Sequence, residues 1–218
     1  MQDGKAAHLS AHQVANGKWS RKELINVMKE HISAMVGRYK GKCTRWEVVN
    51  EALNDDGSYK DNVFYRVIGE DYIPLAFYYA RAADPHVPLW YTDYNLEYNK
   101  AKTEAAQRIV KLVQGHHGAK ISGVGFQGHL ASERTPTSEP APALHTLEDA
   151  FSKLTSLGVD VAYTEMDVRM NVPSNANKDR VQAAVYRRMA QACLHNSKCV
   201  GMTVWASNLM FTRYSDRV

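Results

Sequence analysis

The chain has 218 residues, of which 44% are apolar and 23% are charged, with 13 glycines and 7 prolines. These fractions are typical of a globular protein with one sizeable core, and they exclude global disorder and collagen-like repeats. No window approaches 18 apolar residues without charge, and residues 1–5 do not begin a signal peptide. The net charge of +4 is not concentrated in any basic run, so we expect neither a nucleic-acid nor a membrane partner.

Helical and strand signals alternate along the chain. Ser20 and Glu23 form a capping box in front of apolar residues at helical spacing, which predicts the beginning of the first long helix. By the same criteria and by β-branched or aromatic runs, helices are predicted over residues 20–41, 62–83, 103–114, 147–157 and 179–194, and strands over residues 43–50, 89–91, 121–127, 159–165 and 200–205.

Five strands separated by helices predict an α/β fold built of βαβ units around a parallel sheet. A flat, doubly wound sheet and a (β/α)₈ barrel both fit this alternation. The Gly123-Val124-Gly125 segment lacks the third glycine and the following helix of a dinucleotide-binding loop. A nucleotide-binding Rossmann fold is therefore disfavoured.

Polar and aromatic residues occupy the carboxyl ends of the predicted strands, where parallel α/β folds gather their functional groups. Two carboxyl groups facing each other across a cleft would suit a general acid and a nucleophile acting at an acetal carbon. Amides and aromatic faces suit the hydroxyl groups and the apolar face of a sugar. Glycoside hydrolysis is therefore the favoured chemistry for these strand ends, which are Asn50-Glu51, Asp93-Tyr94-Asn95, Gln127-Gly128-His129, Glu165 and Trp205.

Several of these segments resemble, in order, the signature motifs of family-10 glycoside hydrolases, the endo-β-1,4-xylanases. The segment Trp46-Glu47-Val48-Val49-Asn50-Glu51-Ala52 closely resembles the W-D-V-V-N-E-A motif of that family. The resemblance covers roughly Val14 to Trp205 and implies a (β/α)₈ TIM barrel, whose fourth to eighth strands would be the five predicted here. The further matching segments are residues 93–95, 123–129, 163–167 and 201–205.

The resemblance implies a retaining, double-displacement cleavage of internal β-1,4-xylosidic bonds in xylan. Glu51 resembles the general acid/base and Glu165 the nucleophile of this mechanism. Trp46 is expected in the core, and Glu47 and Asp167 are expected to be structural rather than catalytic. The implied supporting residues are Asn50 on the sugar 2-hydroxyl, Gln127 beside Glu51, His129 beside Glu165, Trp205 against the sugar at the cleavage site, and Tyr94 at the rim.

Three cysteines cannot all pair within one chain. By spacing alone, three reduced thiols and a local Cys193–Cys199 disulfide with Cys43 left over are equally compatible. The family resemblance favours the Cys193–Cys199 disulfide and a secreted protein. No Cys/His cluster has zinc-ligand spacing, so we expect no metal and no cofactor, with xylan and xylo-oligosaccharides as substrates.

The chain is short for the implied fold, because a (β/α)₈ barrel typically takes about 250 residues. We therefore expect residues 1–218 to form a single, partial catalytic domain with about five of eight strands and divergent tails at 1–13 and 206–218. Open sheet edges would favour self-association. The alternative function is a catalytically impaired or inert xylan-binding fragment, since lost substrate positioning can remove about 7–11 kcal/mol of barrier lowering.

Overall fold

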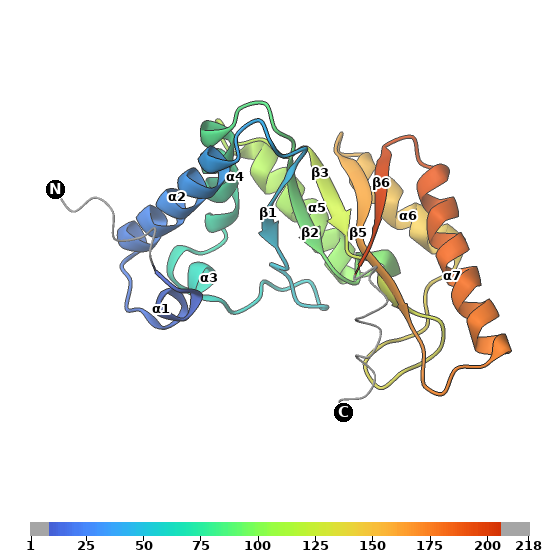
Figure 1. Cartoon of the computed structure of the whole chain (residues 1–218). Helices are drawn as coiled ribbons and strands as arrows, with labels where there is room; N and C mark the ends of the chain where they lie inside the picture. The colour runs from blue at the N-terminus through green and yellow to red at the C-terminus, as the bar shows by residue number, and fades with distance from the viewer. Residues whose placement is uncertain (1–8, 206–218) are drawn as a thin grey trace. The chain divides into compact units, whose positions relative to one another are not determined.

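The structure is a computed structural model that describes residues 9–205 (Figure 1). The expected tail 206–218 and residues 1–8 of the expected tail 1–13 lie outside the described residues. Strands and helices alternate along the chain, as the sequence predicts. The helices are α1 (Ala11–Asn16), α2 (Arg21–Arg38), α3 (Val63–Ile68), α4 (Tyr72–Ala83), the 3₁₀ helix η2 (Leu96–Tyr98), α5 (Ala101–Gly115), α6 (Leu144–Thr155) and α7 (Ala176–Leu194). The strands are β1 (Trp46–Asn50), β2 (Leu89–Asp93), β3 (Gly123–Phe126), β4 (His129–Ala131), β5 (Asp160–Arg169) and β6 (Cys199–Val204).

The described strands form one sheet in the order β1-β2-β3-β5-β4, with β6 also paired to β5. β5 runs parallel to both β4 and β6. The α/β class with parallel strands and intervening helices is thus confirmed. The sheet contains six strands rather than five, because the short strand β4 follows Gly128 and has too few residues to give a sequence pattern.

The chain folds as two compact units, and the division between them passes through β2 and β3. Unit 1 comprises the described residues up to Tyr91 together with Ala105–Gly123. Unit 2 comprises Thr92–Glu104 and the described residues from Val124 onward.

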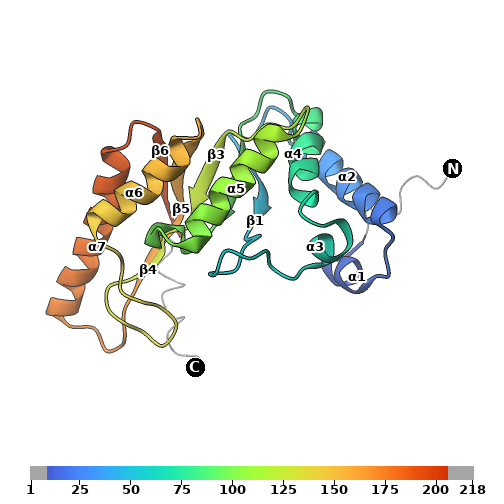
Figure 2. The ribbon, with the colours of Figure 1, turned by 180° about the vertical axis from the view of Figure 1, so that it is seen from behind.

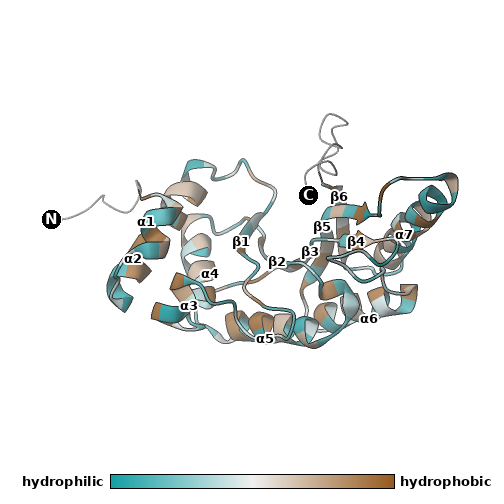
Figure 3. Cartoon of the chain, turned by 90° about the horizontal axis from the view of Figure 1, so that it is seen from below, coloured by the Kyte–Doolittle hydropathy of each residue, from teal (hydrophilic) through white to brown (hydrophobic). Residues whose placement is uncertain are grey.

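In unit 1, α2 begins at the capping box that the sequence predicts. The Ser20 hydroxyl accepts from the Glu23 N–H, and the Glu23 carboxylate accepts from the Ser20 N–H at 2.9 Å. α2 packs against α4, and α4 packs against β1. α2 carries both polar and apolar residues (Figure 3), and its buried residues are Leu24, Val27, Met28 and Val36.

The single helix predicted over residues 62–83 is wrong, because it divides into α3 and α4. Gly69 ends α3 with φ of +74°, a left-handed conformation that glycine adopts without steric cost. Pro74 lies in the first turn of α4, where a missing N–H breaks no intrahelical hydrogen bond.

In unit 2, α6 and α7 pack against each other and both cover β5 (Figures 1 and 2). The core under these helices contains an aromatic cluster of Phe126, Phe151 and Tyr163, all of which are fully buried. The rings of Phe126 and Phe151 meet edge to face at 4.7 Å, and those of Phe151 and Tyr163 lie 5.1 Å apart. Such aromatic pairs stabilise the core beyond the area that they bury.

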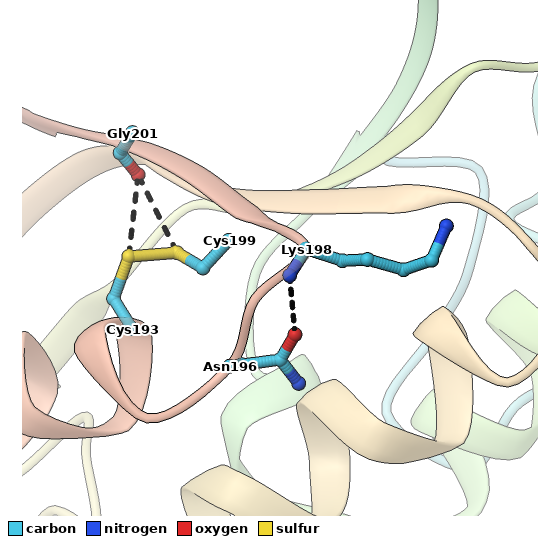
Figure 4. The surroundings of a disulfide bond; sticks show 5 residues. All are labelled: Cys193, Asn196, Lys198, Cys199 and Gly201. Atoms are coloured by element: carbon cyan, nitrogen blue, oxygen red, sulfur yellow. Dashed lines mark hydrogen bonds between the residues drawn. A yellow bond between two sulfur atoms is a disulfide. The ribbon is translucent and has the colours of Figure 1, made fainter.

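The Cys193–Cys199 disulfide is present, which confirms the pairing favoured by the family resemblance (Figure 4). It joins the end of α7 to the beginning of β6 across a Cα–Cα distance of 5.2 Å. The Gly201 carbonyl oxygen lies 4.0 Å and 3.9 Å from the two sulfurs; these are contacts, because a disulfide sulfur carries no hydrogen. Between the cysteines, the Lys198 N–H donates to Asn196 Oδ1 at 3.0 Å, and the bond and this turn together hold β6 beside α7. Cys43 is a free thiol.

Two positions of β3 require glycine, because neighbouring side chains approach the backbone closely there. A Cβ on Gly123 would lie 2.4 Å from the Trp90 indole, and a Cβ on Gly125 would lie 2.7 Å from Thr164 Cγ2 and 2.8 Å from Thr92 Oγ1. Both threonines are buried. This packing explains why glycine interrupts an otherwise β-branched and aromatic strand.

No helix within residues 9–205 has the length and apolar character needed to cross a membrane.

We expect Gly125→Ala to lower the free energy of unfolding by about 1–3 kcal/mol, because the added methyl group must displace buried threonine side chains. Gly37→Ala is the control: no atom lies within 4 Å of the added Cβ in α2, so this change should be neutral or stabilising by up to about 1 kcal/mol. Urea denaturation measures both variants. Equal stability of Gly125→Ala and the wild type would contradict the close packing of β3.

Candidate active site

Glu51 directly follows β1 in unit 1 and has a positive φ of 53°, which turns the chain away from the strand. Its Oε2 accepts a hydrogen bond from Lys60 Nζ at 2.9 Å, and its side chain is 39% exposed. The backbone brings the two residues together, because the Lys60 N–H donates to the Ala52 carbonyl at 2.8 Å. Asn50, the last residue of β1, is exposed beside Glu51.

Lys60 was missed by the sequence analysis. It lies nine residues after Glu51 in a loop that carries no strand or helix signal, and the pair forms only because residues 52–60 fold back on themselves. Leu53 and Tyr59 form an antiparallel bridge in this loop. No local pattern in the sequence indicates that contact.

In unit 2, His129 lies between two carboxylates of β5. Its Nε2 is 3.3 Å from Glu165 Oε2, and its Nδ1 is 3.0 Å from Asp167 Oδ2. Residues 165 and 167 point to the same face of β5 because side chains alternate along a strand. The parallel register then aligns His129 with Asp167. All three side chains are partly buried, and that of Glu165 is 17% exposed.

The pKa of His129 is raised above its ordinary value, first by the hydrogen bond with Asp167 and then by the charges of Asp167 and Glu165, while partial burial opposes the shift. A neutral imidazole has one N–H donor and can donate to one carboxylate, whereas the imidazolium can donate to both. The two carboxylates therefore stabilise the protonated ring. The sequence analysis treated Asp167 as structural. The structure places it against His129, which in turn contacts Glu165.

Trp205 lies beside this group. Its ring centroid is 6.2 Å from that of His129 at an interplanar angle of 85°. The backbone N–H of Trp205 donates to the Met166 carbonyl at 3.0 Å. The side chain is exposed. The structure therefore places an accessible aromatic ring next to His129.

Tyr94 follows β2 and packs on a buried ion pair. Lys102 Nζ lies 3.0 Å from Asp93 Oδ1 and 3.2 Å from the centroid of the Tyr94 ring. The Lys102 and Asp93 side chains are 2% and 0% exposed, so the ammonium is shielded from water where it meets the ring. This cation fixes the start of the loop that carries Tyr94.

Gln127 is buried, at 2% exposed, between β2 and β5. Its N–H donates to the Asp93 carbonyl at 3.0 Å, and its carbonyl accepts from the Glu165 N–H at 2.9 Å. The structure thus gathers five of the predicted site residues within unit 2, and places the other two in unit 1. The unit 2 residues are Tyr94, Gln127, His129, Glu165 and Trp205; those of unit 1 are Asn50 and Glu51.

Within residues 9–205, no group of three or more histidine, cysteine, aspartate or glutamate side chains is arranged to hold a metal ion.

Comparison with known proteins gives one consistent family. The sequence profile of glycosyl hydrolase family 10 matches residues 8–210. Endo-1,4-beta-xylanase 1 of Gibberella zeae is 56% identical over 193 residues, which cover 88% of this chain and 54% of the relative. Endo-1,4-beta-xylanase A of Fusarium oxysporum f. sp. lycopersici is 54% identical, with 88% and 59% covered. The chain therefore spans about half the length of the curated relatives that it matches.

Solved structures agree with the sequence relatives. The Penicillium canescens endo-1,4-beta-xylanase XylE superposes with a TM-score of 0.82 at 35% identity, covering 92% of this chain and 60% of that one. A GH10 xylanase from Bispora sp. MEY-1, solved with xylobiose, gives a TM-score of 0.81 at 38% identity and covers 88% and 58%. These matches confirm the expected fold class, which is of the TIM-barrel type. The chain contains part of the strands of such a barrel.

We expect Asp167→Asn to lower the pKa of His129 toward its ordinary value, because Asp167 is the largest cause of the raised pKa. A histidine in the unfolded chain titrates at about pH 6.5. The stabilisation of the fold by the His129–Asp167 contact is therefore complete below that pH and is lost as the pH rises through the native pKa. The variant should therefore lose more stability at pH 6 than at pH 9.

NMR titration of the His129 ring, combined with thermal melts at both pH values, measures these effects. Asp160→Asn is the control, since Asp160 lies on the same strand but only approaches Lys198 at 4.0 Å. An unchanged His129 titration in Asp167→Asn would refute the assigned contact.

Proposed function

Because the chain belongs to glycosyl hydrolase family 10, as its motifs predict, we propose that it cleaves internal β-1,4-xylosidic bonds of xylan with retention of configuration. Glu165 is the nucleophile and Glu51 is the general acid/base in this proposal. The observation that carries it is the placement of His129 between Glu165 and Asp167. Retaining glycosidases hold their two carboxyl groups about 5–5.5 Å apart.

The contacts of Glu165 support its role as nucleophile. A nucleophilic carboxylate must be ionised and must direct one oxygen at the anomeric carbon. The 3.3 Å contact with His129 Nε2 fixes Oε2 and thereby the direction of Oε1. Asp167 on the opposite nitrogen holds the imidazole in that orientation. The glycosyl–enzyme bond would then form at Oε1 while Oε2 keeps its partner.

Glu51 must be protonated when the leaving oxygen departs and ionised when water attacks. The Lys60 ammonium, at 2.9 Å, stabilises the carboxylate form that the second step needs. An ionised Glu165 nearby would act in the opposite direction in the resting enzyme, and this repulsion would end when Glu165 is esterified. These two opposed charges would set when Glu51 holds its proton.

The remaining predicted site residues suit a sugar chain. The exposed ring of Trp205 would pack against the sugar at the cleavage site, and Asn50 would hydrogen-bond its 2-hydroxyl. Tyr94 would shape the rim, and the buried Gln127 would support the site from beneath. Xylan and xylo-oligosaccharides are the proposed substrates, in keeping with relatives named as xylanases and a solved relative that holds xylobiose.

We further propose that residues 1–218 belong to one catalytic domain and that the protein acts outside the cell. The curated relatives are fungal endo-1,4-beta-xylanases, and the family resemblance implies a secreted protein. The Cys193–Cys199 disulfide supports an oxidising compartment, because disulfides persist poorly among cytosolic thiols.

We expect Glu165→Ala to reduce xylan hydrolysis to background, and Glu51→Ala to reduce it by about 10²–10⁴-fold. An aryl β-xylobioside with a good leaving group needs no proton from the enzyme in the first step. In the first turnover, Glu51→Ala should therefore be impaired far less in the release of that phenolate than on xylan, whereas Glu165→Ala should be inactive in both assays.

Reducing-sugar release from xylan and phenolate release measure these effects. Glu148→Gln is the control, because Glu148 lies on α6 and pairs with His195 at the end of α7. Background activity in the folded wild type would refute the proposed hydrolysis. Retained xylan affinity in that case would indicate the inert xylan-binding alternative.

We also propose that the chain associates with a second copy of itself through β6. Among the described strands, β6 pairs with β5 alone, and apolar residues at alternate positions along β6 are exposed. Val200, Met202 and Val204 are 57%, 44% and 53% exposed. An apolar, unpaired strand edge of this kind favours pairing between chains.

Analytical ultracentrifugation tests this association. The wild type should form dimers or larger species as its concentration rises, and the double variant Val200→Lys/Met202→Lys should be monomeric, because edge lysines oppose strand pairing. A wild type that is monomeric at every concentration would contradict the proposal.

A further inference from the structure

Glu97, in the 3₁₀ helix η2, is a buried carboxyl group to which the mechanism above gives no role. It is 1% exposed. Its Oε1 accepts a hydrogen bond from the Gly128 N–H at 2.7 Å. Its Oε2 is buried and has no hydrogen-bond partner among the described residues, and the buried hydroxyl of Tyr163 has none either. A glutamate in such a place is costly, so its contact with Gly128 calls for a physical explanation.

The contact fixes the turn that carries His129. Gly128 has φ of +77°, and a Cβ there would lie 3.0 Å from Met189 Cε and 3.2 Å from Tyr163 Cδ1, so the turn is closely packed. On one side, the Gly128 carbonyl accepts from the Asp167 N–H at 3.2 Å, which ties the turn to β5. On the other side, Glu97 accepts from the Gly128 N–H. The peptide groups next to His129 are therefore held by β5 and by Glu97 together.

The charge state of Glu97 suits this position. Burial raises its pKa to about 7, opposed by hydrogen bonds from its own N–H and from Gly128 and by the positive charge of His129, while the charge of Asp93 raises it further. Asp93 itself is paired with Lys102, and burial holds the pKa of Tyr163 well above its usual range. Below neutral pH, Glu97 is thus mainly a neutral carboxyl whose carbonyl oxygen can accept from Gly128.

We propose that Glu97 is a positioning residue for the nucleophile: through Gly128 it fixes His129 in the place where the imidazole meets both Glu165 and Asp167. The role of Glu165 as nucleophile rests on the proposed function, but the structural coupling from Glu97 to His129 does not. Because Glu97 acts through its acceptor oxygen, the neutral isostere Gln should replace it, whereas a side chain without an acceptor at that distance should not.

The coupling is tested by NMR titration of the His129 ring and by amide exchange at Gly128. In Glu97→Gln the His129 pKa should stay close to its raised wild-type value, and Gly128 should stay protected. In Glu97→Leu the His129 pKa should fall toward its ordinary value, because the ring loses its fixed contact with Asp167, and Gly128 should exchange at least about tenfold faster. Glu97→Asp, which keeps the carboxyl but is one methylene shorter, should behave like Glu97→Leu and replaces it if the leucine variant does not fold.

A folded Glu97→Leu or Glu97→Asp variant with wild-type His129 titration would overturn the proposal. It would equally be overturned if Glu97→Gln lowered the His129 pKa as far as Glu97→Leu does, since the effect would then be one of charge and not of position.

Kinetics on xylan provide a second readout. Glu97→Leu should lower kcat by about 10- to 100-fold with little change in KM, because a misplaced reacting group costs turnover rather than binding. Glu97→Gln should restore kcat. A wild type without turnover would refute the proposed function and would leave the NMR test of Glu97 valid, so the two failures are distinguishable.

Discussion

The imidazole of His129, held between Glu165 and Asp167, is the interaction on which the candidate site of unit 2 depends. Side-chain alternation along β5 presents the two carboxylates on one face, and the parallel pairing of β4 with β5 brings the histidine level with them. Trp205, which hydrogen-bonds to β5 through its backbone, adds an exposed ring beside the group. A one-residue slip of either strand would separate the histidine from both carboxylates.

Several buried polar groups in unit 2 make close contacts near this group. Lys102 pairs with Asp93 and meets the Tyr94 ring, so one shielded cation supports the end of β2. Gly125 lets β3 approach the threonines of its neighbouring strands. The hydrogen bond from Gly128 to Glu97 continues this support up to His129. Tyr94 and His129 are thus supported by buried residues, Lys102 and Glu97.

The two proposed catalytic glutamates have different electrostatic surroundings. Glu165 meets an imidazole whose own protonation is stabilised by Asp167, whereas Glu51 meets the ammonium of Lys60. A lysine keeps its charge over the whole neutral range, but a histidine with a raised pKa loses its charge as the pH rises. The surroundings of Glu165 therefore respond to pH more than those of Glu51, which separates the proposed roles of the two groups.

The sequence by itself determined the α/β class and the family. It also singled out Glu51, Glu165 and His129 as candidate site residues, because each lies in a contiguous motif at a strand end. It left the disulfide open by spacing, and it merged α3 with α4 because the left-handed turn at Gly69 leaves little trace in apolar periodicity. Tertiary structure decided which side chains and backbone groups these residues meet. Loop closure brings Lys60 to Glu51, and strand register brings Asp167 to His129. The buried Glu97 meets the backbone of Gly128. Such contacts join residues that are distant in sequence or placed by another strand, so no local pattern could reveal them.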